Sequence, residues 1–371
     1  MKVLFISHHT DLYGANRSLI ELAEDMIKRY GVEVHIICPN KGRFYTEAVA
    51  IGAHVRCFNY FTWQSRRFFL LKYVLRVLMN PLLLKRINRY VASISPDIIH
   101  SNSSVTDLGA VLAQKNRLPF VWHIREFGKE HYKFRYLIKQ TSVKNYYEKA
   151  DRIIAVSDEL KENYLGKYPN LYITTIYDGV KPITVKWEKH KTINFCIVGN
   201  ICDNKGQLDV LKALSILIGK GKKDISLHII GDGEKKYIRK VDKYIKEKKL
   251  EKYTVLHGYS NNIADVLRNM DVGIMASKYE AFGRVTVEYM YAGLGVIASY
   301  EGGTKEIVGK RALLYKPGDI DKLAALMEYC IENKQLVREC GQKMRLEAEM
   351  RFNQLINTDK IMRIYADLGV K

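Results

Sequence analysis

Short β-branched runs alternate with amphipathic stretches along almost the whole chain of 371 residues. Examples of the runs are KVLFIS at 2–7, FVWHI at 120–124, INFCIVGN at 193–200 and ISLHIIGDG at 225–233. Buried parallel strands joined by crossover helices produce this alternation. A chain of this length is also longer than one that usually folds around a single hydrophobic core. The sequence therefore predicts an α/β protein with two doubly wound domains in series.

A polar stretch, DGVKPITVKWEKHKT at 178–192, interrupts the pattern. It carries a proline and lacks helical periodicity, which is typical of a linker. We expect an N-terminal domain at 1–180, a linker at 181–192 and a C-terminal domain at 193–350. Residues 351–371 are expected to form a helix that crosses back to the N-terminal domain.

The cysteines and the first residues bear on the compartment. The six cysteines form no CxxC pair and no metal-binding spacing, so we expect reduced and mostly buried thiols in a cytosolic protein. The opening residues, MKVLFISHHT, have too short an apolar run for a signal peptide and no cleavage-site pattern. They predict a buried first strand.

Two glutamates flank a glycine in YEAFGRVTVEYMYAGLGVIAS, residues 279–299. Gly283 favours a helix that begins after Glu280 and contains Glu288. The free N–H groups of the first helical turn would then lie between the two carboxylates. Helix N-termini bind phosphate, and carboxylates accept hydrogen bonds from sugar hydroxyls. The stretch thus predicts a site for an anionic group flanked by hydroxyls.

Other candidate residues follow expected strands, where doubly wound sheets bind ligands. In the first loop, Gly14 either allows the backbone to approach a ligand closely or belongs to a turn capped by Asn16. The sequence lacks a GxGxxG motif, so dinucleotide binding has no support. His123, Arg125 and Glu126 leave one strand together, which favours a site over a structural network. Lys205 precedes a helix, where a lysine either pairs with phosphate or is an ordinary surface residue.

A pair of glycines, Gly302 and Gly303, precedes Thr304 in SYEGGTKEIV. The paired glycines permit a backbone close to a ligand, and Thr304 is the expected N-cap of the next helix.

In order and spacing these motifs resemble one family over nearly the whole chain, the retaining nucleotide-sugar glycosyltransferases of family 4. The most specific match is EAFGRVTVE to the family's E-x7-E motif, followed by AGLGVIAS and GGTKEIV. GANRSL, VWHIREF, YDGV and the GN…KGQ loop also match. The resemblance implies the GT-B fold, in which two Rossmann-like domains face each other across a cleft.

The resemblance also implies roles for single residues. His123 and Glu280 would lie at the transferred sugar, and Glu288 would bind the ribose hydroxyls of a nucleoside diphosphate donor. The remaining donor-binding positions would be Gly14, Asn200, Lys205, Phe282, Gly283, Arg284 and Val285. The family is usually metal-independent, and no DxD-type pair falls in an expected site, so no metal or cofactor is implied. Retention would let the departing phosphate take the acceptor's proton, with no protein nucleophile and with Glu280 stabilising positive charge on the sugar.

Four departures from the family pattern are present, and one is in the first loop, where the paired glycine is reduced to Tyr13-Gly14. Asn200 stands where an arginine is usual, so Lys205, helix N–H groups or Arg284 would have to neutralise the pyrophosphate. Gly295 replaces a proline, and Asp178 replaces an asparagine. Both glutamates remain, so we expect an active enzyme.

The formal net charge of +20 is unevenly placed. No acidic residue lies between Glu47 and Asp97, and the segment around 68–81 reads as a helix that is apolar on most faces and ends at Pro81. Lys72 and Arg76 are expected to form a basic stripe on it, with Arg66 and Arg67 just before it. The helix either packs in the core or lies on an anionic membrane; its run is too short and too charged to span one.

These features predict transfer of a hexose-type sugar to a lipid-linked or oligosaccharide acceptor in cell-surface glycan synthesis. The protein would be cytoplasmic and peripherally bound to the inner face of the cell membrane. An epimerase or sugar-phosphate synthase of the same fold is an alternative. A basic nucleic-acid-binding protein is a weaker one, because the basic residues follow no nucleic-acid module and no such partner is expected.

Overall fold

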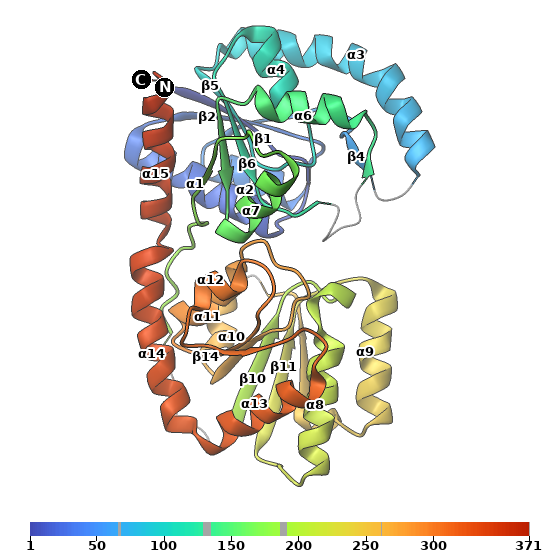
Figure 1. Ribbon diagram of the computed structural model, residues 1–371, viewed down its shortest axis with the longest axis vertical. Helices are drawn as coiled ribbons and strands as arrows, with labels where there is room; N and C mark the ends of the chain where they lie inside the picture. Colours follow the sequence, from blue (N-terminus) through green and yellow to red (C-terminus); the bar gives the residue numbers. More distant parts are fainter. Residues whose placement is uncertain (66–67, 129–134, 186–190, 261, 371) are drawn as a thin grey trace. The chain divides into compact units, whose positions relative to one another are not determined.

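The computed structural model describes residues 1–65, 68–128, 135–185, 191–260 and 262–370 (Figure 1). The chain divides into two compact units, residues 1–181 together with 354–371, and residues 182–353. Each unit contains its own parallel sheet and its own buried apolar core. The expected fold class, two doubly wound α/β units, is confirmed.

The sheet of the first unit has seven strands in the order β3-β2-β1-β5-β6-β8-β9. The order reverses between β1 and β5, so the loops that follow these strands diverge at the carboxyl edge, where such sheets bind ligands. The strands are β1 (Lys2–Ile6), β2 (Glu33–Cys38), β3 (His54–Cys57), β5 (Ile98–Ser101), β6 (Phe120–Ile124), β8 (Arg152–Ala155) and β9 (Ile173–Thr175). The helices are α1 (Gly14–Tyr30), α2 (Arg43–Ala50), α3 (Phe69–Ile94), α4 (Leu108–Asn116), α6 (Gln140–Glu148), α7 (Asp158–Lys167) and α15 (Gln354–Asp367), and β4 (Gln64–Ser65) pairs with β7 (Arg135–Tyr136).

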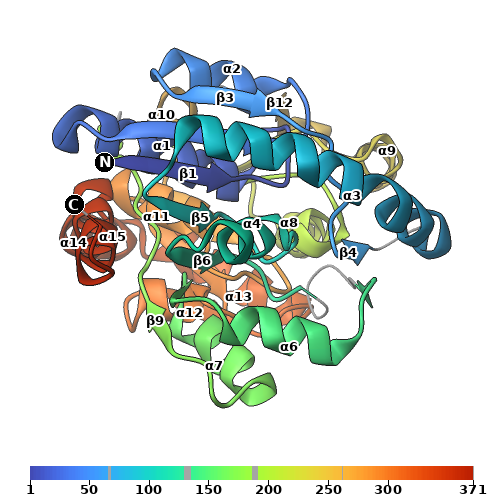
Figure 2. The ribbon, with the colours of Figure 1, turned by 90° about the horizontal axis from the view of Figure 1, so that it is seen from above.

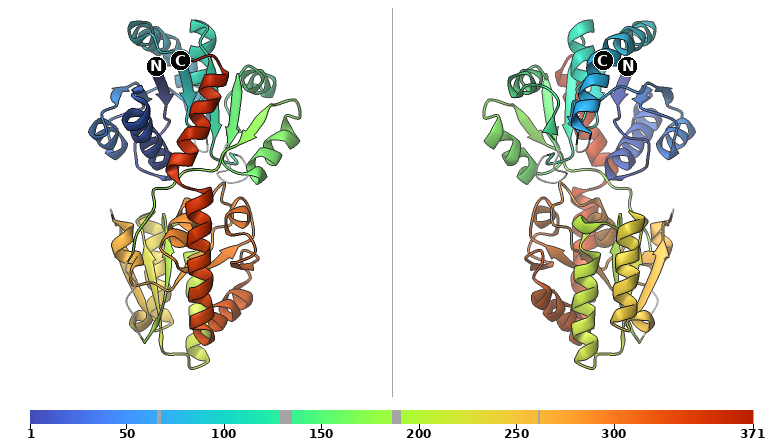
Figure 3. Two further views of the ribbon diagram at one scale, coloured as in Figure 1. Left: turned by 90° about the vertical axis from the view of Figure 1, so that its left-hand side faces the viewer. Right: turned by 90° about the vertical axis from the view of Figure 1, so that its right-hand side faces the viewer.

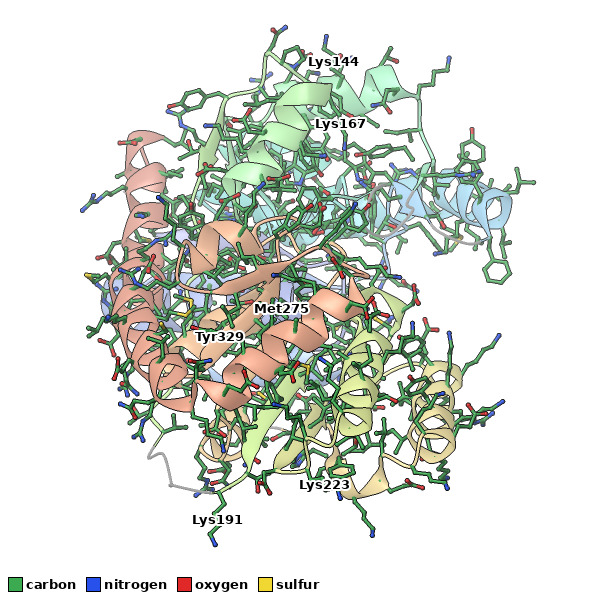
Figure 4. The ribbon with its side chains drawn as sticks, turned by 60° about the horizontal axis from the view of Figure 1, so that its bottom comes forward. Lys144, Lys167, Lys191, Lys223, Met275 and Tyr329 are labelled. Atoms are coloured by element: carbon green, nitrogen blue, oxygen red, sulfur yellow. The ribbon has the colours of Figure 1, made fainter. Side chains whose placement is uncertain are left out.

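The sheet of the second unit has six strands in the order β12-β11-β10-β13-β14-β15, with the reversal between β10 and β13. The strands are β10 (Ile193–Val198), β11 (Ile225–Ile230), β12 (Thr254–Gly258), β13 (Val272–Met275), β14 (Gly295–Ser299) and β15 (Leu313–Tyr315). The helices are α8 (Gln207–Gly219), α9 (Lys235–Glu247), α10 (Ile263–Leu267), α11 (Arg284–Tyr291), α12 (Thr304–Val308), α13 (Ile320–Glu332) and α14 (Lys334–Arg351). In Figure 4, Met275 marks the end of β13 and Tyr329 lies on α13.

Helix α15 is part of the first unit although it is the last helix in the chain. It packs along α1, as Figure 3 shows. Ile361 and Tyr365 are fully buried in the same core as β1 and α1, and Arg29 of α1 pairs with Asp359 at 2.9 Å. The last turns of the chain thus complete the core of the unit that contains the first strand.

The expectation that the helix near residue 70 ends at Pro81 is wrong. Helix α3 runs for 26 residues and contains Pro81. Proline within a helix removes one backbone hydrogen bond and crowds the preceding turn. Just before it, the amide of Asn80 bonds both the N–H (3.1 Å) and the carbonyl (2.9 Å) of Phe61, and beyond it Ile87 and Val91 are buried. These tertiary contacts hold the helix together past the proline.

Asn16, the cap in one of the two readings of the first loop, and Thr304, the expected cap of the later helix, are not N-caps. Asn16 lies inside the first turn of α1, whose N-cap is Tyr13, and its buried amide donates to the carbonyls of His9 (3.0 Å) and Asp11 (2.8 Å). Thr304 is the first residue of α12, and Gly303 is the N-cap. The amide of Asn16 bonds the loop before the helix instead of the helix end. The hydroxyl of Thr304 has no hydrogen-bond partner among the described residues.

Candidate functional site

The helix entry at Gly283 has the geometry that the glycine indicated. Gly283 is the N-cap of α11, with φ +95°, a conformation that strains other residues. Glu280 precedes the helix and Glu288, 4% exposed, lies within it. The first N–H groups of α11 therefore lie between the two glutamates in sequence, as expected.

Two buried hydroxyls surround the bare backbone of Gly283. A methyl group added there would lie 3.2 Å from Thr304 Oγ1, 3.3 Å from Thr286 Oγ1 and 3.4 Å from Glu280 Cγ. Both threonines are fully buried, and neither hydroxyl oxygen has a hydrogen-bond partner in the described structure. An unsatisfied buried hydroxyl costs about 1–3 kcal/mol. Two of them beside a helix N-terminus suit a polar, anionic ligand.

A glycine holds the backbone of Glu280. The N–H of Gly303 donates to the carbonyl of Glu280 at 2.8 Å. At Gly302, φ +70°, an added Cβ would lie 2.3 Å from that same carbonyl oxygen. The paired glycines therefore let the loop after β14 pass close against Glu280.

Lys205 and Glu280 form an ion pair, with Nζ and Oε2 2.6 Å apart. Lys205 ends a short 3-10 turn and is followed by Gly206, φ +73°, where a Cβ would meet the carbonyl of Ala276 at 2.4 Å. The structure thus brings together two predicted site residues that are 75 positions apart in the sequence. A phosphate that binds Lys205 would compete with Glu280 for the ammonium group.

The other predicted residues of this unit differ in exposure. Asn200 is exposed, and its carbonyl accepts from Gln207 Nε2 at 3.1 Å. Arg284 Nε lies 3.6 Å from Glu288 Oε1, and both side chains are nearly covered. Phe282 is buried edge-on against Phe352, with 5.8 Å between ring centroids, and Val285 is half-buried. Arg284 is therefore a second cation at the entry to α11.

In the first unit, the polar residues after β6 form a buried network. Arg125 pairs with Asp178 and donates from Nε to Asn102 Oδ1 at 2.8 Å. Asp178 also accepts from Ser18 Oγ at 3.0 Å. Asp178, which replaces the family's asparagine, thus supplies the carboxylate that Arg125 requires in a buried position.

Glu126 is enclosed by hydroxyl and amide donors. Its Oε1 accepts from Ser103 Oγ (2.9 Å), Ser104 N (2.6 Å) and Ser104 Oγ (2.5 Å). Burial raises the pKa of Glu126, and these hydrogen bonds oppose the rise. The motif therefore contains a structural network at Glu126 as well as a candidate site residue at His123.

His123 is fully buried beside a second histidine. Burial and, secondarily, the charge of Arg125 lower the pKa of His123 well below its usual value. The same two causes lower the pKa of His100 to about 3. Both rings are therefore neutral at physiological pH. His100 carried no motif signal, and its pairing with His123 follows only from the adjacency of β5 and β6.

Gly14 is the first residue of α1, and an added Cβ would have nothing within 4 Å. The described residues therefore give no structural reason for a glycine at this position.

One group of described side chains could hold a metal ion. Glu33, His35 and His54, on the neighbouring strands β2 and β3, have ligand atoms within 4.8 Å of one another. Within the group His35 Nε2 already bonds Glu33 Oε1 at 2.8 Å, and Lys2 lies 3.6 Å from the other carboxylate oxygen. Glu33 and His35 are thus already engaged with each other and with Lys2, and His54 is exposed, so the group carries no assignment.

Comparison with protein families gives two adjoining matches. The description "Glycosyltransferase Family 4" applies to residues 13–182, and "Glycosyl transferases group 1" to residues 183–347. A glycosyltransferase of Methanocaldococcus jannaschii is 26% identical over 74% of this chain and 76% of that protein. A UDP-Gal:α-D-GlcNAc-diphosphoundecaprenol α-1,3-galactosyltransferase of Escherichia coli is 26% identical over the same shares of the two chains.

Solved structures agree on the fold. Anabaena HepE in complex with UDP superposes with a TM-score of 0.82 at 22% identity, covering 99% of this chain and 100% of that one. The same protein with UDP-glucose gives a TM-score of 0.81 at equal identity, over 99% of this chain and 100% of that one. The two sheets, the E-x7-E stretch at the entry to α11 and the continuous family match lead to one conclusion: the chain belongs to the family 4 glycosyltransferases and has the GT-B fold.

Proposed function

We propose that this glycosyltransferase moves a hexose-type sugar, with retention, from a nucleoside diphosphate donor to a lipid-linked saccharide acceptor in cell-surface glycan synthesis. The observation that carries the donor half is the entry to α11, where two buried hydroxyls have no hydrogen-bond partner among the described residues and Lys205 pairs with Glu280 just before the helix. The UDP complexes of HepE and the UDP-galactose-dependent relative support a nucleotide-sugar donor.

The residues divide the donor between them. Lys205 and the N–H groups of α11 neutralise the pyrophosphate as the glycosidic bond breaks. Glu288 accepts hydrogen bonds from the ribose hydroxyls. Arg284, held 3.6 Å from Glu288, adds charge where Asn200 lacks it. Gly14 lets the first loop approach the donor. The backbone of Phe282, Gly283 and Val285 lies near its sugar and pyrophosphate.

Glu280 acts as a charge partner and not as a nucleophile in this proposal. In the free protein its carboxylate is held by Lys205 at 2.6 Å. When phosphate takes the lysine, the carboxylate is released to stabilise positive charge on the sugar ring. The departing phosphate oxygen takes the acceptor's proton, which keeps the new bond on the face of the old one.

The donor proposal is tested by screening nucleotide sugars for slow release of nucleotide and for calorimetric binding of the free nucleoside diphosphates. We expect one nucleotide to bind in the wild type and Glu288→Gln to weaken it. Lys212→Ala, which removes an exposed lysine of the same unit outside the site, should bind the nucleotide as the wild type does. Failure of every nucleoside diphosphate to bind the folded wild type would overturn the proposal.

The acceptor half rests on helix α3. The first half of this helix extends away from the strands of the first unit in Figures 1 and 2. Its apolar side chains are exposed, with Leu70 at 78%, Leu78 at 64% and Leu82 at 61%. A further seven exposed apolar residues are Phe68, Phe69, Leu71, Tyr73, Val74, Val77 and Met79. Packing in the core, the alternative reading of this segment, therefore applies only to its second half.

Cations accompany this exposed apolar surface. Lys72, Lys85, Arg86 and Arg89 are exposed on α3. Arg76 is not part of the expected basic stripe, because it is partly buried, pairs with Asp107 and donates to the carbonyl of Phe61 at 2.8 Å. Arg66 and Arg67 lie outside the described residues. Exposed apolar side chains can bury in the acyl region of a bilayer, and cations without neighbouring acids are attracted to anionic headgroups. The surface of α3 therefore suits an anionic lipid bilayer.

No helix among the described residues combines the length and apolar character needed to cross a membrane. We therefore propose peripheral binding of α3 to the inner face of the cell membrane, where a lipid-linked acceptor is presented.

Vesicle sedimentation tests this binding. The wild type should sediment with anionic vesicles at low salt and be released by salt. Leu70→Ser with Leu78→Ser should abolish sedimentation, whereas Leu346→Ser, an equally exposed leucine (60%) on α14, should leave it unchanged. The membrane proposal would be refuted if the wild type did not sediment, or if the variant with Leu70→Ser and Leu78→Ser sedimented as the wild type does. Neither result would bear on donor binding, which is tested separately.

A further inference from the structure

Three buried side chains form a hydrogen-bonded row through the first unit. The hydroxyl of Tyr365, on α15, lies 2.5 Å from Nδ1 of His100 on β5. Nε2 of His100 lies 3.3 Å from Nδ1 of His123 on β6. All three residues are fully buried. The row joins the last helix of the chain to the histidine at the end of β6.

Arg125 determines where the proton of His123 sits. Its Nη2 lies 3.3 Å from Nδ1 of His123. A guanidinium only donates hydrogen bonds, so Nδ1 of His123 must accept. A neutral imidazole carries one proton, and that proton must therefore be on Nε2.

The tautomer of His100 follows from that of His123. Nε2 of His100 faces the lone pair of His123 Nδ1, and two lone pairs facing each other repel. His100 must therefore carry its own proton on Nε2 and accept at Nδ1. The only group at Nδ1 in the described structure is the Tyr365 hydroxyl, whose pKa burial raises well above its usual value, so that it keeps its proton and donates it.

The result is a one-way row of donors, from Tyr365 to His100 to His123, that ends at Nε2–H of His123. This nitrogen is buried and has no hydrogen-bond partner among the described residues. A buried donor without an acceptor is costly unless a ligand supplies one.

We propose that Tyr365 and His100 are positioning residues that hold His123 as a neutral Nε2–H donor, which gives a hydrogen bond to an oxygen of the bound sugar and accepts no proton. This inference rests on the proposed function of the site as a sugar-binding one. It excludes His123 as the general base, because the only lone pair of the ring is already taken by Arg125 and His100. The acceptor's proton must then go to another oxygen, which agrees with the departing phosphate.

Nitrogen-15 spectra of histidine-labelled protein test the row without any substrate. In the wild type, His100 and His123 should both show the Nε2–H tautomer and keep it from pH 5 to 8. Tyr365→Phe keeps the ring but removes the donor to Nδ1 of His100, so the unprotonated Nδ1 signal of His100 should shift to that of a nitrogen without a hydrogen bond while both tautomers are kept. Tyr147→Phe, which removes another fully buried hydroxyl of the same unit, should leave both signals unchanged. A wild-type Nδ1–H signal at His123 would overturn the proposal.

Kinetics separate a fixed donor from a base. In His123→Gln the side-chain amide can still donate from a position near Nε2, whereas His123→Ala donates nothing. We expect His123→Gln to retain at least tenfold more kcat/KM than His123→Ala, with a pH profile that has the wild-type shape. Tyr365→Phe should lower kcat/KM about tenfold, also without a change in profile. Loss of an acidic limb in His123→Gln would identify a base and refute the proposal.

The two proposals fail in different ways. Absence of activity and of nucleotide binding with an intact Nε2–H signal would refute the glycosyl donor site and the sugar contact, and would leave the row as a structural feature. Normal activity with the opposite tautomer would refute the row alone.

Discussion

Gly302→Ala should displace Glu280 and slow the reaction. The glycine has φ +70°, and the added Cβ would lie 2.3 Å from the carbonyl oxygen and 3.0 Å from the nitrogen of Glu280. The left-handed backbone costs a non-glycine residue about 1–2 kcal/mol. Relieving the contact requires the two loops to separate by about 1 Å, and overpacking of this kind costs a further 1–3 kcal/mol or so. A displacement of about 1 Å at a catalytic group can slow turnover about 100-fold.

Gly318→Ala is the matched control. Gly318 belongs to the same unit and has φ +83°, but an added Cβ would have nothing within 4 Å. It should show only the backbone cost and keep its activity. Urea unfolding followed by circular dichroism, together with turnover of the donor found by screening, measures both effects. Equal stability and equal turnover of the two variants would refute the placement of Gly302 against Glu280.

The remaining predictions concern charge. Lys205→Ala should weaken nucleoside diphosphate binding by about 1.5–3 kcal/mol, because it removes a charge-assisted contact; calorimetry measures this, and wild-type affinity would show that Arg284 or the helix N-terminus suffices. Glu288→Ala should also weaken nucleotide binding while the protein remains folded by circular dichroism, and unchanged affinity would remove Glu288 from the ribose site. Burial lowers the pKa of His100 in the folded protein below the usual 6.5, so the unfolded chain binds more protons and stability falls as pH drops below 6.5. His100→Gln should reduce that slope by up to about 1.4 kcal/mol per pH unit between pH 5 and 6.5, and an unchanged slope in urea unfolding would contradict the neutral buried ring.

Strand and helix patterns predicted the architecture because each buried strand has its own local signal. The helix entry at Gly283 was predictable for the same reason, since a glycine between a loop and an amphipathic run carries a backbone requirement. Local signals failed where a distant contact decided the outcome. Pro81 does not end α3, because Asn80 bonds Phe61 and the later turns pack in the core. Asn16 does not cap α1, because its amide is used by the loop that precedes the helix.

The pairings inside the site were beyond any local pattern. Lys205 and Glu280 are far apart in sequence and meet only because β10 and β13 are neighbours in the sheet. Tyr365 had no motif to mark it, since its role depends on α15 packing in the first unit. Arg125 and Asp178 were both noticed, but their pairing depends on the chain after β9 passing close to the end of β6. Residue type suggested chemistry, and topology decided the partners.

The discontinuity of the first unit has a consequence for the order in which the chain folds during synthesis. Residues 182–353 leave the ribosome as a complete unit, with every strand of their sheet present. The first unit is translated earlier but lacks Ile361, Ile364 and Tyr365 of its core until α15 emerges. Until then α1 lacks the apolar side chains of α15 that cover it, and exposed apolar surface of this kind promotes aggregation during folding. The domain that is made first is therefore the one that finishes folding last.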